Sequence, residues 1–169
     1  MKKIQNKGLT GFTLIETLVA ITILTLGIVG PLELAYRSIS YTKLSQNKII
    51  ASYLAQEGME LVRYIRDKNK INSDPWLRGL ANCKGSSYCR MDAYSVSVDT
   101  CGVGPTCPPI RYSGSQGYNY TVGNPTIFTR NINIVEMEAY EAKISVSVVW
   151  NERIGQKRID LEENIYNIP

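Results

Sequence analysis

The sequence predicts an α+β protein in which one long N-terminal helix, partly transmembrane, packs on a C-terminal antiparallel β-sheet head, a lollipop-like arrangement. Three observations predict this fold. An apolar stretch opens the helical part of the chain, an amphipathic stretch continues it to about Asp67, and period-two strand patterns fill the C-terminal part. A chain in which the helix comes first and the strands follow, without alternation of the two, is typical of an α+β fold.

The apolar stretch runs from Gly11 to about Leu32, and Glu16 is its one charged residue. Three lysines precede it. About 20 apolar residues suffice to span a membrane, and the basic flank predicts a cytoplasmic N-terminus with the head outside. A secretory signal has a shorter apolar core of about 7–15 residues. A carboxylate in a spanning helix costs roughly 2.5–3.5 kcal/mol at the bilayer centre, so Glu16 is a candidate functional residue.

The residues Gly11, Phe12 and Glu16 form a recognisable pattern. The run Gly-Phe-Thr-Leu-Ile-Glu at 11–16 resembles the N-terminal signal of type IV pilins and type II secretion pseudopilins. The resemblance implies that a prepilin peptidase cuts between Gly11 and Phe12 and methylates the new amino terminus of Phe12. It also implies that Glu16 pairs with the amino terminus of a neighbouring subunit, which makes Glu16 an assembly residue.

The amphipathic helix and the C-terminal segment resemble those of minor family members. The resemblance therefore implies a minor pilin of a type IV pilus, with a minor pseudopilin of a type II secretion system as the alternative. The implied partners are prepilin peptidase, other pilin or pseudopilin subunits, a membrane assembly platform and membrane lipid. The implied location is the bacterial cytoplasmic (inner) membrane, crossed once, and then a pilus or pseudopilus at the cell surface. A membrane-anchored extracellular binding domain that shares only the signal stays open.

One helix break is predicted, at Gly27, Gly30 and Pro31. Proline removes a backbone donor and clashes with the preceding turn, so we expect a kink or local melting there. The alternative is a proline tolerated within a membrane helix. The resemblance favours a flexible joint that lets subunits repack during assembly.

Beyond Pro31 the helix becomes amphipathic. Its apolar residues recur at near-helical spacing and predict the face that packs on the head: Ile50, Leu54, Leu61, Val62 and Ile65. Charged residues lie elsewhere on the helix, as a solvated face or a contact site. Ion pairs of Arg63 with Glu60 and with Asp67 are within reach on the helix surface.

These patterns divide the chain into four segments. They are a leader at 1–11, a membrane and polymerisation helix at 12–33, an amphipathic helix at 34–68 and a globular head at 69–169. Within the head we expect a loop at 69–88 anchored by Trp76, then strands at 94–99, 126–136 and 143–150. A turn at 151–155 precedes a last strand in which Ile159 and Leu161 share one face.

The four cysteines form two equally spaced pairs. Five residues separate Cys83 from Cys89, and five separate Cys101 from Cys107. An even count in an exported domain predicts two disulfides with three possible connectivities, and the local pairs are our first choice. A four-cysteine zinc site is the alternative, although its usual spacing within a pair is two to four residues.

Composition disfavours catalysis. The sequence has no histidine, which removes Ser/His and Cys/His catalytic pairs and histidine-containing metal sites. The nearest acidic cluster, Glu136, Glu138 and Glu141, lies at a strand junction and reads as a solvated turn or, alternatively, a calcium site. The net charge of +4 falls to +1 without the three leader lysines, which makes nucleic acid an unfavoured partner. We expect no enzymatic activity, no catalytic residue, no metal and no cofactor.

Overall fold

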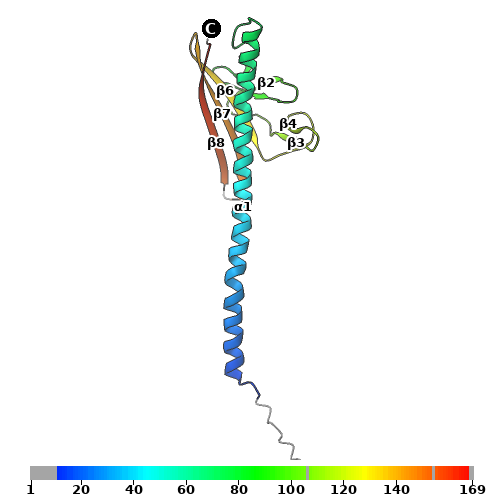
Figure 1. The fold of residues 1–169 in the computed structure, drawn as a ribbon, viewed down its shortest axis with the longest axis vertical. Coiled ribbons are helices and arrows are strands. Elements are labelled where there is room, and N and C mark those ends of the chain that lie inside the picture. The colour runs from blue at the N-terminus through cyan, green and yellow to red at the C-terminus, as the bar shows by residue number, and fades with distance from the viewer. Residues whose placement is uncertain (1–10, 106, 154, 168–169) are drawn as a thin grey trace, which may run out of the picture. The chain divides into compact units, whose positions relative to one another are not determined.

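The computed structural model describes residues 11–105, 107–153 and 155–167 (Figure 1). The predicted leader lies outside the described residues up to position 10. The chain divides into two compact units, residues 1–43 and 44–169, which are described separately below. The second unit contains the C-terminal part of the long helix and the entire head.

Helix α1 runs from Leu14 to Ile71 and comprises 58 residues. Its N-terminal cap is Thr13, whose Oγ1 accepts the backbone N–H of Glu16 at 3.3 Å. The expected end near Asp67 is wrong by about one helical turn. Asn69 explains the extension, because its buried side chain donates to the carbonyls of Trp76 (3.1 Å) and Arg78 (2.8 Å) and so fixes the returning chain.

The local melting predicted at the helix break does not occur in this structure, while a kink there stays a prediction. Gly27, Gly30 and Pro31 are all helical, within a single continuous helix. Proline lacks an N–H, so one carbonyl in the preceding turn loses its intrahelical donor, but the neighbouring turns keep theirs. One missing hydrogen bond does not end a helix that is intact on both sides. A joint that opens during assembly stays a prediction.

The head contains two antiparallel sheets. The larger has the order β2-β1-β6-β7-β8, and the smaller has the order β4-β3-β5. Their bounds are β1 (Ser87–Met91), β2 (Val98–Val103), β3 (Arg111–Ser113), β4 (Gly117–Asn119), β5 (Asn124–Pro125), β6 (Thr129–Glu138), β7 (Glu141–Glu152) and β8 (Gly155–Tyr166). The expected strands at 126–136 and 143–150, and the last strand with Ile159 and Leu161, are confirmed as β6, β7 and β8, each with shifted or wider bounds. A 3-10 turn (Ala81–Cys83) precedes β1.

The strand predicted at 94–99 is wrong over residues 94–97 and right only for Val98 and Asp99. Residues 93–95 form a turn, and β2 begins only at Val98. The buried carboxylate of Asp92 explains the turn, because its Oδ1 accepts the backbone N–H groups of Tyr94 (2.8 Å) and Ser95 (3.3 Å). Val96 follows with a φ of 50°, in the left-handed region that interrupts a strand. The side-chain hydrogen bonds of Asp92 thus override the alternating pattern.

The core lies between one face of the sheet and the head part of α1, beside which β6, β7 and β8 run (Figure 1). The predicted apolar stripe is right for Leu54 and Val62, which are buried, whereas Ile50, Leu61 and Ile65 are only partly buried. The rest of the buried helix face consists largely of small residues: Ala51, Ala55 and Gly58, with Met59. A Cβ on Gly58 would lie 3.0 Å from Val146 Cγ1, so helix and sheet are in close contact there.

Both disulfides form the local pairs predicted as first choice, Cys83–Cys89 and Cys101–Cys107. All four cysteines are therefore used, and the zinc-site alternative is wrong. Cys83 and Cys89 are fully buried in the core cluster. Trp76, the predicted loop anchor, packs against this cluster while partly exposed, and the deeper anchors of the same loop are Leu77 and Leu80.

Candidate functional site

The predicted cleavage site lies in a non-helical segment directly before α1. Gly11, Phe12 and Thr13 have no regular secondary structure and are exposed, with Phe12 at 77%. A Cβ added to Gly11 would meet nothing within 4 Å. The structure of this chain therefore does not itself require glycine at position 11. An exposed, extended segment is the form in which a peptide bond enters a protease cleft, and glycine leaves that approach free of a side chain.

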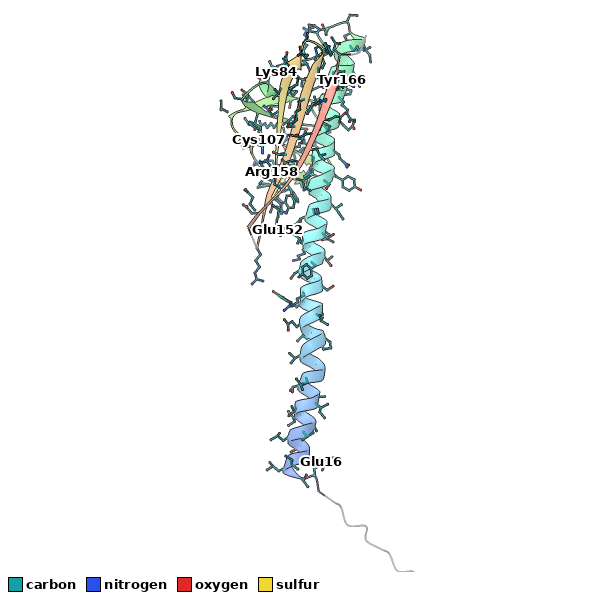
Figure 2. All side chains as sticks on the ribbon, turned by 90° about the vertical axis from the view of Figure 1, so that its left-hand side faces the viewer. Glu16, Lys84, Cys107, Glu152, Arg158 and Tyr166 are labelled. Atoms are coloured by element: carbon teal, nitrogen blue, oxygen red, sulfur yellow. A yellow bond between two sulfur atoms is a disulfide. The ribbon has the colours of Figure 1, made fainter. Side chains whose placement is uncertain are left out.

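Glu16 lies in the first turn of α1, three residues after the capping Thr13 (Figure 2). This is the N3 position of the helix, where the positive end of the helix dipole favours a carboxylate. Among the described residues its carboxylate has no hydrogen-bond or ion-pair partner. It lies four positions after Phe12 in the sequence, and the nitrogen of Phe12 is the one that the predicted cleavage would turn into the amino terminus. The acid is thus exposed and available for a contact with another molecule.

The N-terminal part of α1 is apolar and uncovered. Large apolar side chains from Leu14 to Leu32 are exposed by between 47% at Val19 and 83% at Leu14. This part of the helix is long and apolar enough to cross a membrane, and none of the apolar window is buried within the chain. Such a surface requires lipid or other apolar helices around it.

A family model described as the prokaryotic N-terminal methylation motif matches residues 7–30. The chain carries the type IV pilin and pseudopilin signal. Comparisons with curated proteins and with solved structures gave no significant match. The matched stretch thus covers the predicted cleavage site, Glu16 and most of the apolar part of α1, and it does not extend into the head of this pilin-like chain.

A buried arginine is the main polar contact within that head, and our sequence analysis missed it. Arg130 on β6 is 2% exposed, and its Nη1 donates to the carbonyl of Leu54 (2.9 Å) and to Oε2 of Glu57 (2.7 Å). Its Nη2 donates to the carbonyl of Met91 on β1 at 2.7 Å. Arg130 therefore joins α1, β1 and β6. Strand alternation could have predicted its burial, because every second residue of a strand lies on the same face and residue 130 is two positions before the buried Ile132.

A second polar contact lies near the β7–β8 turn, at the opposite end of the sheet from Tyr166 (Figure 2). Oε1 of Glu152 accepts hydrogen bonds from Nδ2 of Asn47 (2.7 Å) and Nε1 of Trp150 (2.8 Å). These bonds, chiefly that of Asn47, lower the pKa of the Glu152 carboxyl. They tie the first turns of the head part of α1 to the long β7–β8 hairpin.

The helix-surface ion pairs are only partly as predicted. Arg63 pairs with Glu60 at 2.6 Å, which confirms that pair. The predicted Arg63–Asp67 pair is wrong, because Asp67 pairs with Arg66 and Arg63 reaches Glu163 on β8. The hydrogen bond from Arg63 to Glu163 raises the pKa of that guanidinium. The charged helix face is thus partly a contact with the sheet edge.

The acidic cluster at the β6–β7 junction is engaged in separate contacts. Glu136 forms an ion pair with Lys84, and Glu141 accepts hydrogen bonds from Asn164 (2.9 Å) and Tyr166 (3.1 Å). Within the described residues, no group of three or more acidic or cysteine side chains is arranged to hold a metal ion. Glu136 and Glu141 are thus each held by a neighbouring side chain of the head.

Proposed function

We propose that this protein is a structural subunit, a minor pilin, that is processed by prepilin peptidase and incorporated into a type IV pilus. The observation that carries the proposal is the pilin signal, with the free carboxylate of Glu16 four positions after Phe12 at the start of an exposed apolar helix. The same features would serve a minor pseudopilin in a secretion pseudopilus. The choice between these filaments is made by experiment.

In the proposed sequence of events, the basic leader stays in the cytoplasm while α1 crosses the inner membrane and the head lies outside. Prepilin peptidase then cuts after Gly11 and methylates the amino group of Phe12. In the filament, the apolar part of α1 exchanges lipid for neighbouring helices. Glu16 pairs there with the charged amine of another subunit. Removing one partner of such a buried ion pair costs about 3–5 kcal/mol, which makes Glu16 a register residue for assembly.

The proposed role needs no active site in the chain. Its partners are prepilin peptidase, other pilin-like subunits and the membrane assembly platform. The head then supplies the surface by which this subunit differs from its neighbours. Gly27, Gly30 and Pro31 remain the proposed joint, since a proline turn lacks one hydrogen bond and bends at the lowest cost during extraction from the membrane.

Mass spectrometry of the N-terminus of the chain purified from its native host tests processing. We expect a mature chain that begins with N-methylated Phe12. A Gly11→Val variant should remain uncut, and because the space around Gly11 is open, this result would report on the peptidase rather than on folding. An intact Met1 terminus on the wild-type chain would contradict the proposal.

Glu16→Ala tests assembly. We expect the variant to be inserted and cut but to be incorporated poorly into filaments, while Glu33→Ala, at the other acidic residue of the N-terminal unit, is incorporated normally because Glu33 already pairs with Arg37. Wild-type incorporation of the Glu16→Ala variant would refute the role of the carboxylate. Deletion of the gene, followed by assays of piliation and of protein secretion, separates a pilus subunit from a pseudopilus subunit.

A further inference from the structure

The head carries a groove of about 630 Å³ between α1, the turn after β1 and the β3–β4 hairpin. Three tyrosines line it, Tyr53 from the helix, Tyr94 from the turn and Tyr118 from the hairpin. Leu54 is also part of the lining and is buried. The volume falls within the range of about 300–1,000 Å³ that is typical of small-molecule sites.

Two hydrogen-bond acceptors lie among these apolar groups. The side chain of Glu57 is 33% exposed, and its Oε2 is held by Arg130 at 2.7 Å. Oε1 of Gln116 is buried and has no hydrogen-bond partner among the described residues. A buried acceptor without a donor is unfavourable, so a ligand whose hydroxyl or N–H reaches Gln116 gains affinity from satisfying this acceptor.

The walls of the groove are held in place by Asp92. Its Oδ1 fixes the turn that carries Tyr94, and its Oδ2 accepts the backbone N–H of Tyr120 at 2.9 Å, directly after β4. Asp92 is 2% exposed, so these bonds are shielded from water. Two of the three walls are thus tied to the same buried carboxylate, and the groove is formed before any ligand arrives.

The charges in and behind the groove select the class of ligand. The negative charge of Glu57 is balanced by Arg130, and the lining contains no lysine or arginine among the described residues. An anionic ligand would find no counter-charge, and a cationic ligand would meet a carboxylate that is already paired. The groove therefore suits a neutral ligand with hydroxyl donors and apolar C–H faces, because tyrosine rings offer both an apolar surface and a polar tip.

We propose that this groove binds a neutral saccharide. The C–H face of a sugar ring packs on Tyr53, Tyr94 or Tyr118, and its hydroxyls donate to Glu57 and to Oε1 of Gln116. This ligand-binding role goes beyond filament assembly and uses residues far in sequence from Phe12 and Glu16. Binding is measured on the isolated chain and assembly in cells, so failure of one is distinguishable from failure of the other.

The test uses the full chain, solubilised in a detergent without a sugar head group. The probes are three neutral disaccharides, cellobiose, lactose and N,N′-diacetylchitobiose, with glucuronic acid and glucosamine as charged comparators. Saturation-transfer NMR and calorimetric titration should show binding of at least one neutral disaccharide, with a Kd on the order of 1 mM or tighter. Both charged sugars should bind more weakly.

Two groove variants and one matched control make the result specific. Tyr94→Ala and Gln116→Ala should each weaken binding about tenfold, while Tyr64→Ala, which removes an exposed tyrosine of α1 that does not line the groove, should leave it unchanged. Near-UV circular dichroism checks that each variant is folded. If one groove variant does not fold, the other still tests the proposal.

Absence of binding to all three neutral probes would overturn the proposal. So would equal affinities of the groove variants and the Tyr64→Ala control, or tighter binding of a charged sugar. Self-association of the wild-type chain that Tyr94→Ala abolishes would assign the groove to a second copy of the protein instead.

Discussion

Replacement of Arg130 by methionine tests the central contact of the head. Arg130→Met keeps much of the side-chain volume but removes the donors to Glu57, to Leu54 and to Met91. Loss of one partner of a buried ion pair costs about 3–5 kcal/mol, chiefly because the other charge is left unpaired. Since Glu57 is 33% exposed and water can reach it, we expect the lower end of this range, about 3 kcal/mol.

The second half of this experiment removes the remaining charge. In the double variant Arg130→Met/Glu57→Leu no unpaired charge is left, and an ion pair exchanged for apolar residues is often neutral in free energy. We therefore expect the double variant to lie within about 1 kcal/mol of the wild-type chain. A double variant that is less destabilised than Arg130→Met alone indicates that the two charges are coupled. Two independent losses of packing would instead add, and the double variant would be the less stable of the two.

Urea denaturation of the full chain in detergent, followed by tryptophan fluorescence, measures these differences. The sequence has two tryptophans, Trp76 and Trp150, and both lie in the head. The matched control is Arg63→Met, since Arg63 is 34% exposed and its two ion pairs lie at the surface. Exposed pairs contribute about 0–1 kcal/mol. A loss for Arg130→Met no larger than that of the control would refute the reasoning.

Three further predictions follow from contacts within the head. Gly58→Ala should lower the free energy of unfolding, measured in urea, by about 1 kcal/mol, because the new methyl meets Val146 at 3.0 Å and this overpacking outweighs the gain in helix propensity. A higher free energy of unfolding would show that helix and sheet can separate. Asn47→Ala should raise the lowered pKa of Glu152 toward its ordinary value, as followed by NMR titration, and an unchanged pKa would exclude this bond in solution. Burial raises the pKa of Tyr120, so its contribution to stability is complete below about pH 10 and is lost as the pH rises through the folded value. Tyr120→Phe should therefore lose less stability than wild type as the pH rises above about 10, and parallel losses would contradict this.

Local sequence patterns predicted the pilin-type signal, the long helix and the strands β6, β7 and β8. The signal is a contiguous run from Gly11 to Glu16, which a peptidase reads as a linear segment. The alternation of Ile144, Val146 and Val148 with serines is likewise local, since a strand places every second side chain on the same face. Such features depend on neighbours in the chain and are therefore visible without a structure.

Local pairing of the cysteines was the first choice among three connectivities, and the structure decided it. Local patterns gave the wrong secondary structure where a distant side chain, or a side chain that hydrogen-bonds to the nearby backbone, altered the local conformation. Residues 94–99 alternate as a strand does, but Asp92 holds Tyr94 and Ser95 in a turn, and the strand begins only at Val98. Pro31 predicted a break, but the intact turns around it keep α1 continuous.

The long-range partners of the charged residues became visible only in the folded chain. Arg130 and Glu57 are 73 residues apart in the chain, and Arg63 and Glu163 are 100 apart. Periodicity tells which face of an element is buried, but it does not tell which residue of another element lies opposite. The tyrosine groove has the same origin, because its walls come from a helix, a turn and a hairpin that meet only when the sheet packs on α1.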